Sequence, residues 1–154
     1  MWFFSGKRDT AVAKRLDSQN KSVLRGVWGE DIAADFLKRK GWRIVGRNLC
    51  PCKRDRRKEI DIVAYIREEN TVVFVEVKTH KTHPDKAPRA WGVDRAKKRN
   101  LLAAFRAWLR SKKWTGNYRF DSLEIYGDGL DFPEIDHLVN VPIFPPSDRF
   151  FKYG

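Results

Sequence analysis

At 154 residues and 42% hydrophobic content, the chain has the size and core material of one globular domain with short tails. Its 32 Lys and Arg outnumber its 20 Asp and Glu, and the net charge of +12 favours nucleic acid as a partner over an acidic small molecule. No segment approaches the roughly 20 apolar residues of a membrane span, so we expect no membrane insertion.

Two further observations indicate a cytoplasmic protein. The apolar run at the N-terminus is too short for a signal peptide. The only cysteines, Cys50 and Cys52, are separated by one proline, a spacing poorly suited to a mutual disulfide. A secreted disulfide scaffold is therefore not expected.

The first helix is predicted over residues 22–40, with Ser22 as its N-cap and Gly41 as its stop. Residues 5–21 are polar and charged with little periodicity, so we expect residues 1–21 to form a basic N-terminal arm that is either loose or a frayed helix. At 100° per residue one narrow stripe of the predicted helix contains Val23, Val27, Glu30, Ala34 and Leu37.

Glu30 lies in the middle of this otherwise apolar stripe. A carboxylate that faces a core costs free energy unless a partner or a metal ion compensates it. The position also fits a glutamate at the edge of the stripe, whose stem packs while its head reaches water. Position alone leaves both interpretations open.

The remaining elements have strand and helix periodicity in a recognisable order. Strands are predicted over 42–48, 59–66 and 71–79, a helix over 94–113, and two strands over 118–126 and 135–141. The turn at 67–70 makes the second and third strands an antiparallel hairpin. We therefore expect an α/β fold over residues 22–141, with a mixed central sheet flanked by helices in the order αβββαβ. Residues 142–154, rich in proline and aromatic residues, form an irregular tail.

Charged residues interrupt the two apolar strands of this hairpin. Asp61 lies in the second strand, and Glu76 and Lys78 share one face of the third. Asp61 and Glu76 are equally far from the centre of the turn, which makes them cross-strand neighbours within about 5 Å. A divalent cation between the acids is one remedy for their repulsion, and neutralisation by Lys78 or an arginine is the other. Two acids and a lysine suit metal-dependent hydrolysis of a phosphodiester.

The predicted helix 94–113 carries a row of cations beside its buried stripe. The row consists of Arg95, Arg99, Arg106, Arg110 and Lys113. It fits contacts with backbone phosphates, and it also fits an ordinary solvated face. Trp91, Trp108 and Trp114 could stack on bases, although helical spacing places Trp108 in the core.

A second metal hypothesis concerns a loop that is long and basic, residues 49–57. Its cysteines are expected near the end of the third strand, so that Cys50, Cys52, His80 and His83 could form a tetrahedral zinc site. The spacing of the cysteines is tighter than usual for zinc, and the alternative is two reduced thiols and two exposed histidines.

The order of elements and the motif of Asp61 followed by Glu76-Val77-Lys78 resemble the restriction-endonuclease-like nucleases. More closely, the chain resembles the YraN family of small bacterial proteins, related to archaeal Holliday-junction resolvases. The matching residues are Gly29, Glu30, Ala33, Ala34, Leu37, Gly41, Trp42, Asn48, Glu59, Ile60, Asp61 and 74–78. The chain differs at Lys58 and His80, where glycine and arginine are usual.

The resemblance implies roles for these residues. Glu30, Asp61 and Glu76 would gather around one or two Mg²⁺ (or Mn²⁺) ions. Lys78 would position or deprotonate the attacking water, or stabilise charge on the phosphate. Glu59 shares the strand face of Asp61, as an outer partner or a surface residue. The resolvases act on a two-fold symmetric substrate, which implies a homodimer.

The preferred hypothesis is a metal-dependent endonuclease that acts on DNA, including branched DNA as the resemblance implies. The alternatives are a non-catalytic nucleic-acid-binding module for repair, uptake or assembly, and a protein-interaction subunit whose binding would be insensitive to salt.

Overall fold

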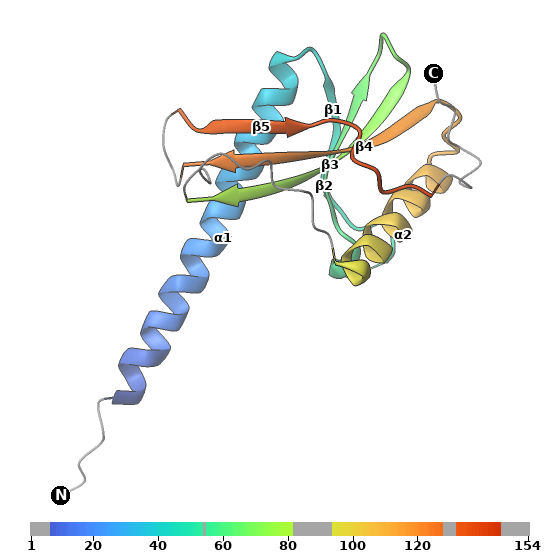
Figure 1. Ribbon diagram of the computed structural model, residues 1–154. Coiled ribbons are helices and arrows are strands. Elements are labelled where there is room, and N and C mark those ends of the chain that lie inside the picture. The colour runs from blue at the N-terminus through green and yellow to red at the C-terminus, as the bar shows by residue number, and fades with distance from the viewer. Residues whose placement is uncertain (1–6, 54, 82–93, 128–131, 146–154) are drawn as a thin grey trace, which may run out of the picture.

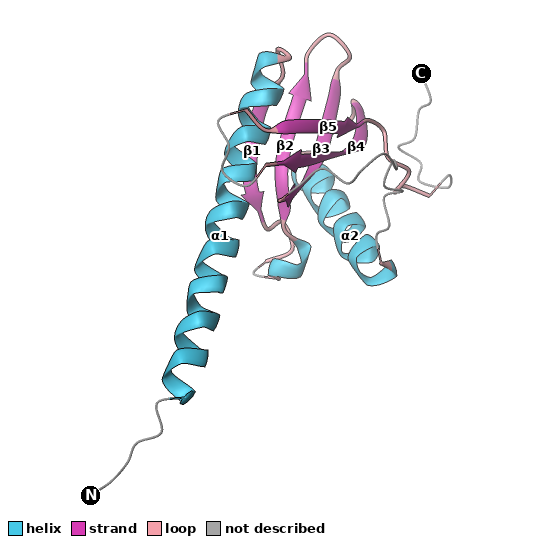
Figure 2. Ribbon diagram, turned by 60° about the vertical axis from the view of Figure 1, so that its left-hand side comes forward, coloured by secondary structure: helices cyan, strands magenta, loops and turns pink. Residues whose placement is uncertain are grey.

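The computed structural model describes residues 7–53, 55–81, 94–127 and 132–145, with side chains from residue 17 onward. A five-stranded mixed sheet has a helix on each face (Figures 1 and 2). The elements are α1 (Lys7–Arg39), β1 (Arg43–Leu49), the 3₁₀ helix η1 (Arg56–Lys58), β2 (Ile60–Ile66), β3 (Thr71–His80), α2 (Arg95–Ser111), β4 (Asn117–Tyr126) and β5 (Glu134–Leu138). This confirms the predicted α/β architecture.

The sheet has the strand order β1-β2-β3-β4-β5. Only β3 and β4 run parallel, because α2 provides the crossover between them, and the other neighbours are antiparallel. Alternate residues of β3 face opposite helices. Phe74 stacks on Phe105 of α2 with ring centroids 4.3 Å apart, whereas Val73 and Val75 belong to the core under α1.

The helix α1 is longer than predicted, and its first half projects away from the sheet (Figure 1). It begins at Lys7 and passes through Ser22, so the prediction of an N-cap at Ser22 is wrong. Nothing in this stretch stops a helix, and Lys21 pairs with Asp17 one turn earlier at 2.8 Å. The prediction that the whole stripe faces the core is also wrong, because Val23 and Val27 are 66% and 51% exposed.

Both helices end in the same hydrogen-bonded motif. After α1, Gly41 adopts a φ of +83°, and the Trp42 amide donates to the Leu37 carbonyl at 3.1 Å, which confirms the predicted stop. After α2, the left-handed position is occupied by Lys113 with a φ of +48°, and the Trp114 amide donates to the Leu109 carbonyl at 3.0 Å. The second motif fixes the place of Trp114.

The hairpin of β2 and β3 has the predicted register. Ile62 is opposite Val75, so the next residues outward, Asp61 and Glu76, are cross-strand neighbours. On the far side of the sheet, Asp121 of β4 is fully buried and accepts hydrogen bonds from His137 and the Asn140 amide, both at 2.8 Å. The strand β5 ends at Leu138, before the predicted end at 141, and Asn140 lies just beyond this end.

The tail prediction is tested only at its beginning. Residues 142–145 have no helix or strand, and Ile143 and Phe144 are buried in the core under α2. Residues 146–154 lie outside the described part of the chain. No helix among the described residues is long and apolar enough to cross a membrane.

Candidate active site

Asp61 and Glu76 line a polar pocket of about 500 Å³ between the hairpin and the first turn of α2. The hairpin supplies the acids because its register places the two residues opposite each other. The other charged residues of the lining are Arg56 and Arg57 of η1, Glu59, Asp94 and Lys97. The pocket therefore combines acids of the hairpin with cations from η1 and α2.

Asp61 is held in an environment that opposes its ionisation. Burial raises the pKa of its carboxyl to about 7, and the charges of Glu76 and Glu30 contribute in the same direction. The Val77 amide donates to Asp61 Oδ2 at 2.8 Å and, with the charge of Lys97, only partly offsets these effects. The positive charge around Asp61 is therefore too small to keep the pKa of its carboxyl at the usual value.

Lys97 is the cation that faces the acid pair, and sequence reasoning missed it. Its ammonium forms an ion pair with the buried carboxylate of Glu76. Lys97 follows the N-cap Asp94, whose side chain accepts from the Ala96 amide at 2.6 Å. The available signal was its place in the first helical turn after the crossover, which must lie over the carboxyl end of β3.

Glu30 lies beside the pocket rather than in its lining. Its Oε2 accepts a hydrogen bond from Asn48 Nδ2 at 2.9 Å and lies 3.6 Å from Arg47. Glu30 is partly buried, so both interpretations of its position are met in part: the stem packs and the head has partners. Its charge reaches Asp61, whose pKa it helps to raise.

Lys78 points along the same sheet face toward β4. It is the register partner of Glu124, and its Nζ lies 4.0 Å from the Glu124 carboxylate. The buried Glu124 also contacts His80 Nε2 at 2.5 Å and Ser122 Oγ at 3.0 Å. Sequence reasoning missed Glu124, because its parallel pairing with β3 depends on the crossover.

The residues of the zinc hypothesis have separate partners. Cys50 Sγ donates to Glu59 and Cys52 Sγ to the Ala103 carbonyl, each at 3.6 Å, and both thiols are free. His80 contacts Glu124, and His83 lies outside the described residues. Within the part of the chain that the structure describes, no three His, Cys, Asp or Glu side chains are arranged to hold one metal ion.

That finding also bears on magnesium. The donor chemistry fits, because carboxylate oxygens are the ligands that Mg²⁺ prefers, and Asp61, whose burial opposes its ionisation, is adjacent to Glu76. The third acid, Glu30, is held by Asn48, and Glu76 is held by Lys97. A metal ion at this place would therefore be bound by the acid pair first and would compete with Lys97.

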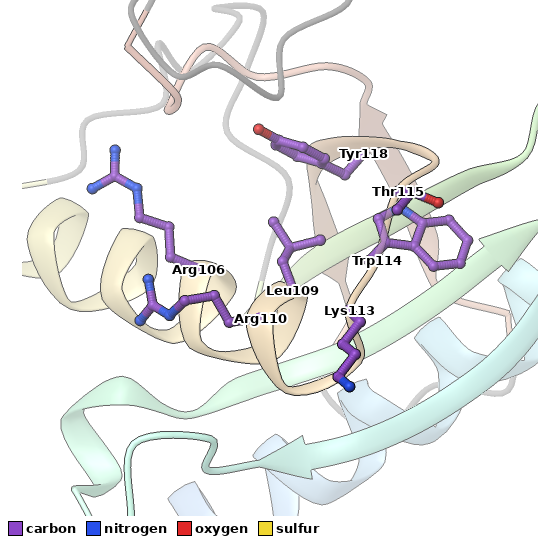
Figure 3. A pocket seen from close by; sticks show the side chains of 7 residues that line it. All are labelled: Arg106, Leu109, Arg110, Lys113, Trp114, Thr115 and Tyr118. Atoms are coloured by element: carbon purple, nitrogen blue, oxygen red, sulfur yellow. The ribbon is translucent and has the colours of Figure 1, made fainter.

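The cations of α2 divide between two places. Arg95 and Arg99 are exposed in the first half of the helix, outside the lining of the acidic pocket. Arg106, Arg110 and Lys113 line a second pocket at its C-terminal end (Figure 3). Trp108 is 5% exposed and belongs to the core, as predicted, whereas Trp91 lies outside the described residues.

Comparison with known proteins identifies one family, both by a family model and by individual relatives. The model of the uncharacterised protein family UPF0102 matches residues 29–125. A UPF0102 protein of Geobacter sulfurreducens is 39% identical over 125 residues, which cover 80% of this chain and 92% of that protein. A UPF0102 protein of Paenarthrobacter aurescens is 38% identical over 124 residues, which cover 77% and 93%. The matched region contains the acid pair, β1 to β3 and β4 up to residue 125. The chain belongs to the UPF0102 family, which is the YraN family.

Proposed function

We propose that this protein is a metal-dependent nuclease that hydrolyses phosphodiester bonds in DNA, with the pocket around Asp61 and Glu76 as its active site. The observation that carries the proposal is the acid pair itself. Two carboxyl groups are adjacent and largely buried, and the pKa of Asp61 is raised to about 7. An arrangement that costs stability in this way is typical of a functional site.

The surroundings of the pair suit a phosphodiester. Arg56 and Arg57 belong to the lining of the pocket, and Arg95 and Arg99 add exposed positive charge on α2. Lys97 is the cation nearest the acids, and its flexible side chain can turn from Glu76 to a phosphate oxygen. The cations would thus bind and orient the strand while the acids face its scissile phosphate.

Asp61 and Glu76 are the proposed ligands of Mg²⁺ or Mn²⁺, with Glu30 as a third ligand after it leaves Asn48. The ion would lower the pKa of the attacking water and offset charge on the phosphoryl oxygens. Lys78, held near Glu124, is further along the sheet face, so we assign the phosphate contact inside the pocket to Lys97.

A binding module without turnover is the second candidate. The ion pair of Lys97 with Glu76 favours it, because this cation already neutralises one of the two acids. In such a protein the basic surface would bind nucleic acid, and the only role of the acids would be to hold the side chain of Lys97 in position.

The test is cleavage of labelled duplex, single-stranded and four-way-junction DNA in Mg²⁺, Mn²⁺ or EDTA. Asp61→Asn and Glu76→Gln should abolish cleavage, because each removes a ligand charge. Asp35→Asn removes an exposed carboxylate on α1 outside the pocket and is the matched control. Cleavage that survives in Asp61→Asn would refute the assignment, and salt-sensitive binding without cleavage would favour the binding module.

A further inference from the structure

A second pocket lies at the C-terminal end of α2, away from the acids. Its volume is about 480 Å³. Three cations, Arg106, Arg110 and Lys113, and three largely apolar side chains, Leu109, Trp114 and Tyr118, line it together with Thr115 (Figure 3). No acidic side chain belongs to this lining, so the pocket differs in chemistry from the one around Asp61.

The local backbone builds this pocket in a fixed form. The motif that ends α2 turns the chain at Lys113 and brings Trp114 back beside Leu109. The indole Nε1 donates to the Asn117 carbonyl at 3.0 Å, and the ring edge contacts Tyr65 with centroids 5.7 Å apart. With its N–H already bonded, Trp114 offers a ring surface rather than a polar group.

The floor of the pocket is apolar and closely packed. Leu109 is 5% exposed and Tyr118 is 8% exposed, and the Tyr118 ring packs against Phe144. Trp114 is only partly buried, so part of its ring remains accessible from the pocket. A ligand that fits can therefore combine a flat apolar body with negative charge, because aromatic and cationic side chains line the same pocket.

We propose that this pocket binds one unpaired nucleotide of a single-stranded nucleic acid, with its base against Trp114 and its phosphates on Arg106, Arg110 and Lys113. Stacking of bases on aromatic side chains beside a cationic track is the usual way to hold single strands without sequence selection. The choice of nucleic acid as the occupant rests on the proposed function, but the pocket does not depend on catalysis.

The position of the pocket defines how a strand would run. Lys97 at the acidic pocket and Lys113 are 16 residues apart on or just after α2, about 24 Å at 1.5 Å per residue. This distance corresponds to roughly seven phosphates along one strand of a B-form duplex. A strand held at the second pocket would meet Arg106 there, and exposed Arg99 lies between the two pockets in the sequence of α2. An unpaired end or branch would be gripped at one end of α2 while the duplex lies near the acids.

The test compares two fluorescent 12-nucleotide strands in EDTA, oligothymidylate and an abasic strand with the same number of phosphates. The wild-type protein should bind oligothymidylate about 5- to 100-fold more tightly, because only that strand can stack. Trp114→Leu should abolish most of this preference while leaving the affinity for the abasic strand unchanged. A strand with one 5-iodouridine should form its photochemical crosslink to Trp114 or Tyr118 in the unaltered protein, which tests the contact without a substitution.

Neighbouring lysines give a matched pair of variants. Lys113→Gln should lower the slope of log Kd against log salt by about 0.7, the contribution of one phosphate contact to a single strand. Lys112→Gln removes an adjacent exposed lysine outside this pocket and should leave the slope closer to that of the wild type.

The outcomes separate this proposal from the proposed function. Equal affinity for the two strands, or crosslinks only to residues outside the pocket, would overturn the nucleotide pocket and leave DNA binding intact. No salt-sensitive binding of either strand, or of duplex DNA, would overturn both. Cleavage lost in Asp61→Asn together with the full preference for oligothymidylate would support both.

Discussion

The raised pKa of Asp61 predicts that the acid pair destabilises the metal-free protein, and increasingly so as the pH rises. The ordinary pKa of an aspartate is 3.8, and in the folded protein that of Asp61 is about 7. The folded state therefore binds more protons than the unfolded state between these values, so the free energy of unfolding falls as the pH rises through this window. The full effect of a shift of this size is about 4 kcal/mol, reached above pH 7.

Asp61→Asn removes this titration while it keeps an oxygen that can accept from the Val77 amide. We expect the variant to be more stable than the wild type, with an advantage that grows by about 3 kcal/mol between pH 5 and pH 8. The assay is urea unfolding at several pH values in EDTA. Addition of Mg²⁺ at pH 8 should narrow the difference, since an ion that binds the folded wild type stabilises it.

Asp35→Asn is the control, because Asp35 is an exposed carboxylate of α1 that lies 3.6 Å from Lys38. Its effect should stay within about 0.5 kcal/mol at every pH. If Asp61→Asn and the wild type lose stability in parallel between pH 5 and 8, the acid pair is not electrostatically strained, and the main support for the proposed function is lost.

Three further predictions concern the fold and are measured by urea unfolding. Gly29→Ala should destabilise the protein by about 1–3 kcal/mol, because its new Cβ would lie 2.0 Å from Thr79 Cγ2. The new Cβ of Gly26→Ala would meet nothing within 4 Å, so this variant should stabilise α1 by up to about 1 kcal/mol. Equal effects of the two substitutions would contradict the packing of α1 on β3. Lys113→Gly should stabilise by about 0.5–1 kcal/mol, since glycine adopts a φ of +48° without strain, and a loss of stability would contradict this. Burial opposes ionisation of Asp121, but its hydrogen bonds lower the pKa of its carboxyl below the usual value. Asp121→Asn should therefore lower the free energy of unfolding by about 2 kcal/mol at pH 7 and by progressively less below pH 4. A loss of stability that does not change with pH would contradict an ionised Asp121.

The register of the hairpin was predictable because a short turn determines which residues face each other. The pairing of Asp61 with Glu76 follows from counting outward from that turn, and it is what brings the acids together. Helix ends were predictable only where a residue requires them: Gly41 ends α1, but no residue near Ser22 forces a beginning.

The partners of the charged residues were not predictable, because they depend on contacts between elements far apart in the chain. Lys97 reaches Glu76 only because the crossover places the first turn of α2 beside β3. Lys78 was expected in the acid cluster, and it lies instead near Glu124, a residue of the parallel strand β4. Alternation along a strand predicts which face a side chain occupies, but not which neighbour on that face binds it.

The length of α1 has a consequence for local stability. The helix is continuous over Lys7–Arg39, yet the first of its described side chains to pack against the core under α1 is Trp28, and the fully buried ones are Ala33, Ala34 and Leu37. The part before Trp28 exposes the large apolar side chains that are described in it, Val23, Leu24 and Val27, and most helical stability in proteins comes from tertiary packing. Its amide hydrogens should therefore exchange with solvent orders of magnitude faster than those near Leu37, which open only when the domain unfolds. One geometrically uniform helix thus consists of two thermodynamic units, and the boundary between them lies next to Glu30.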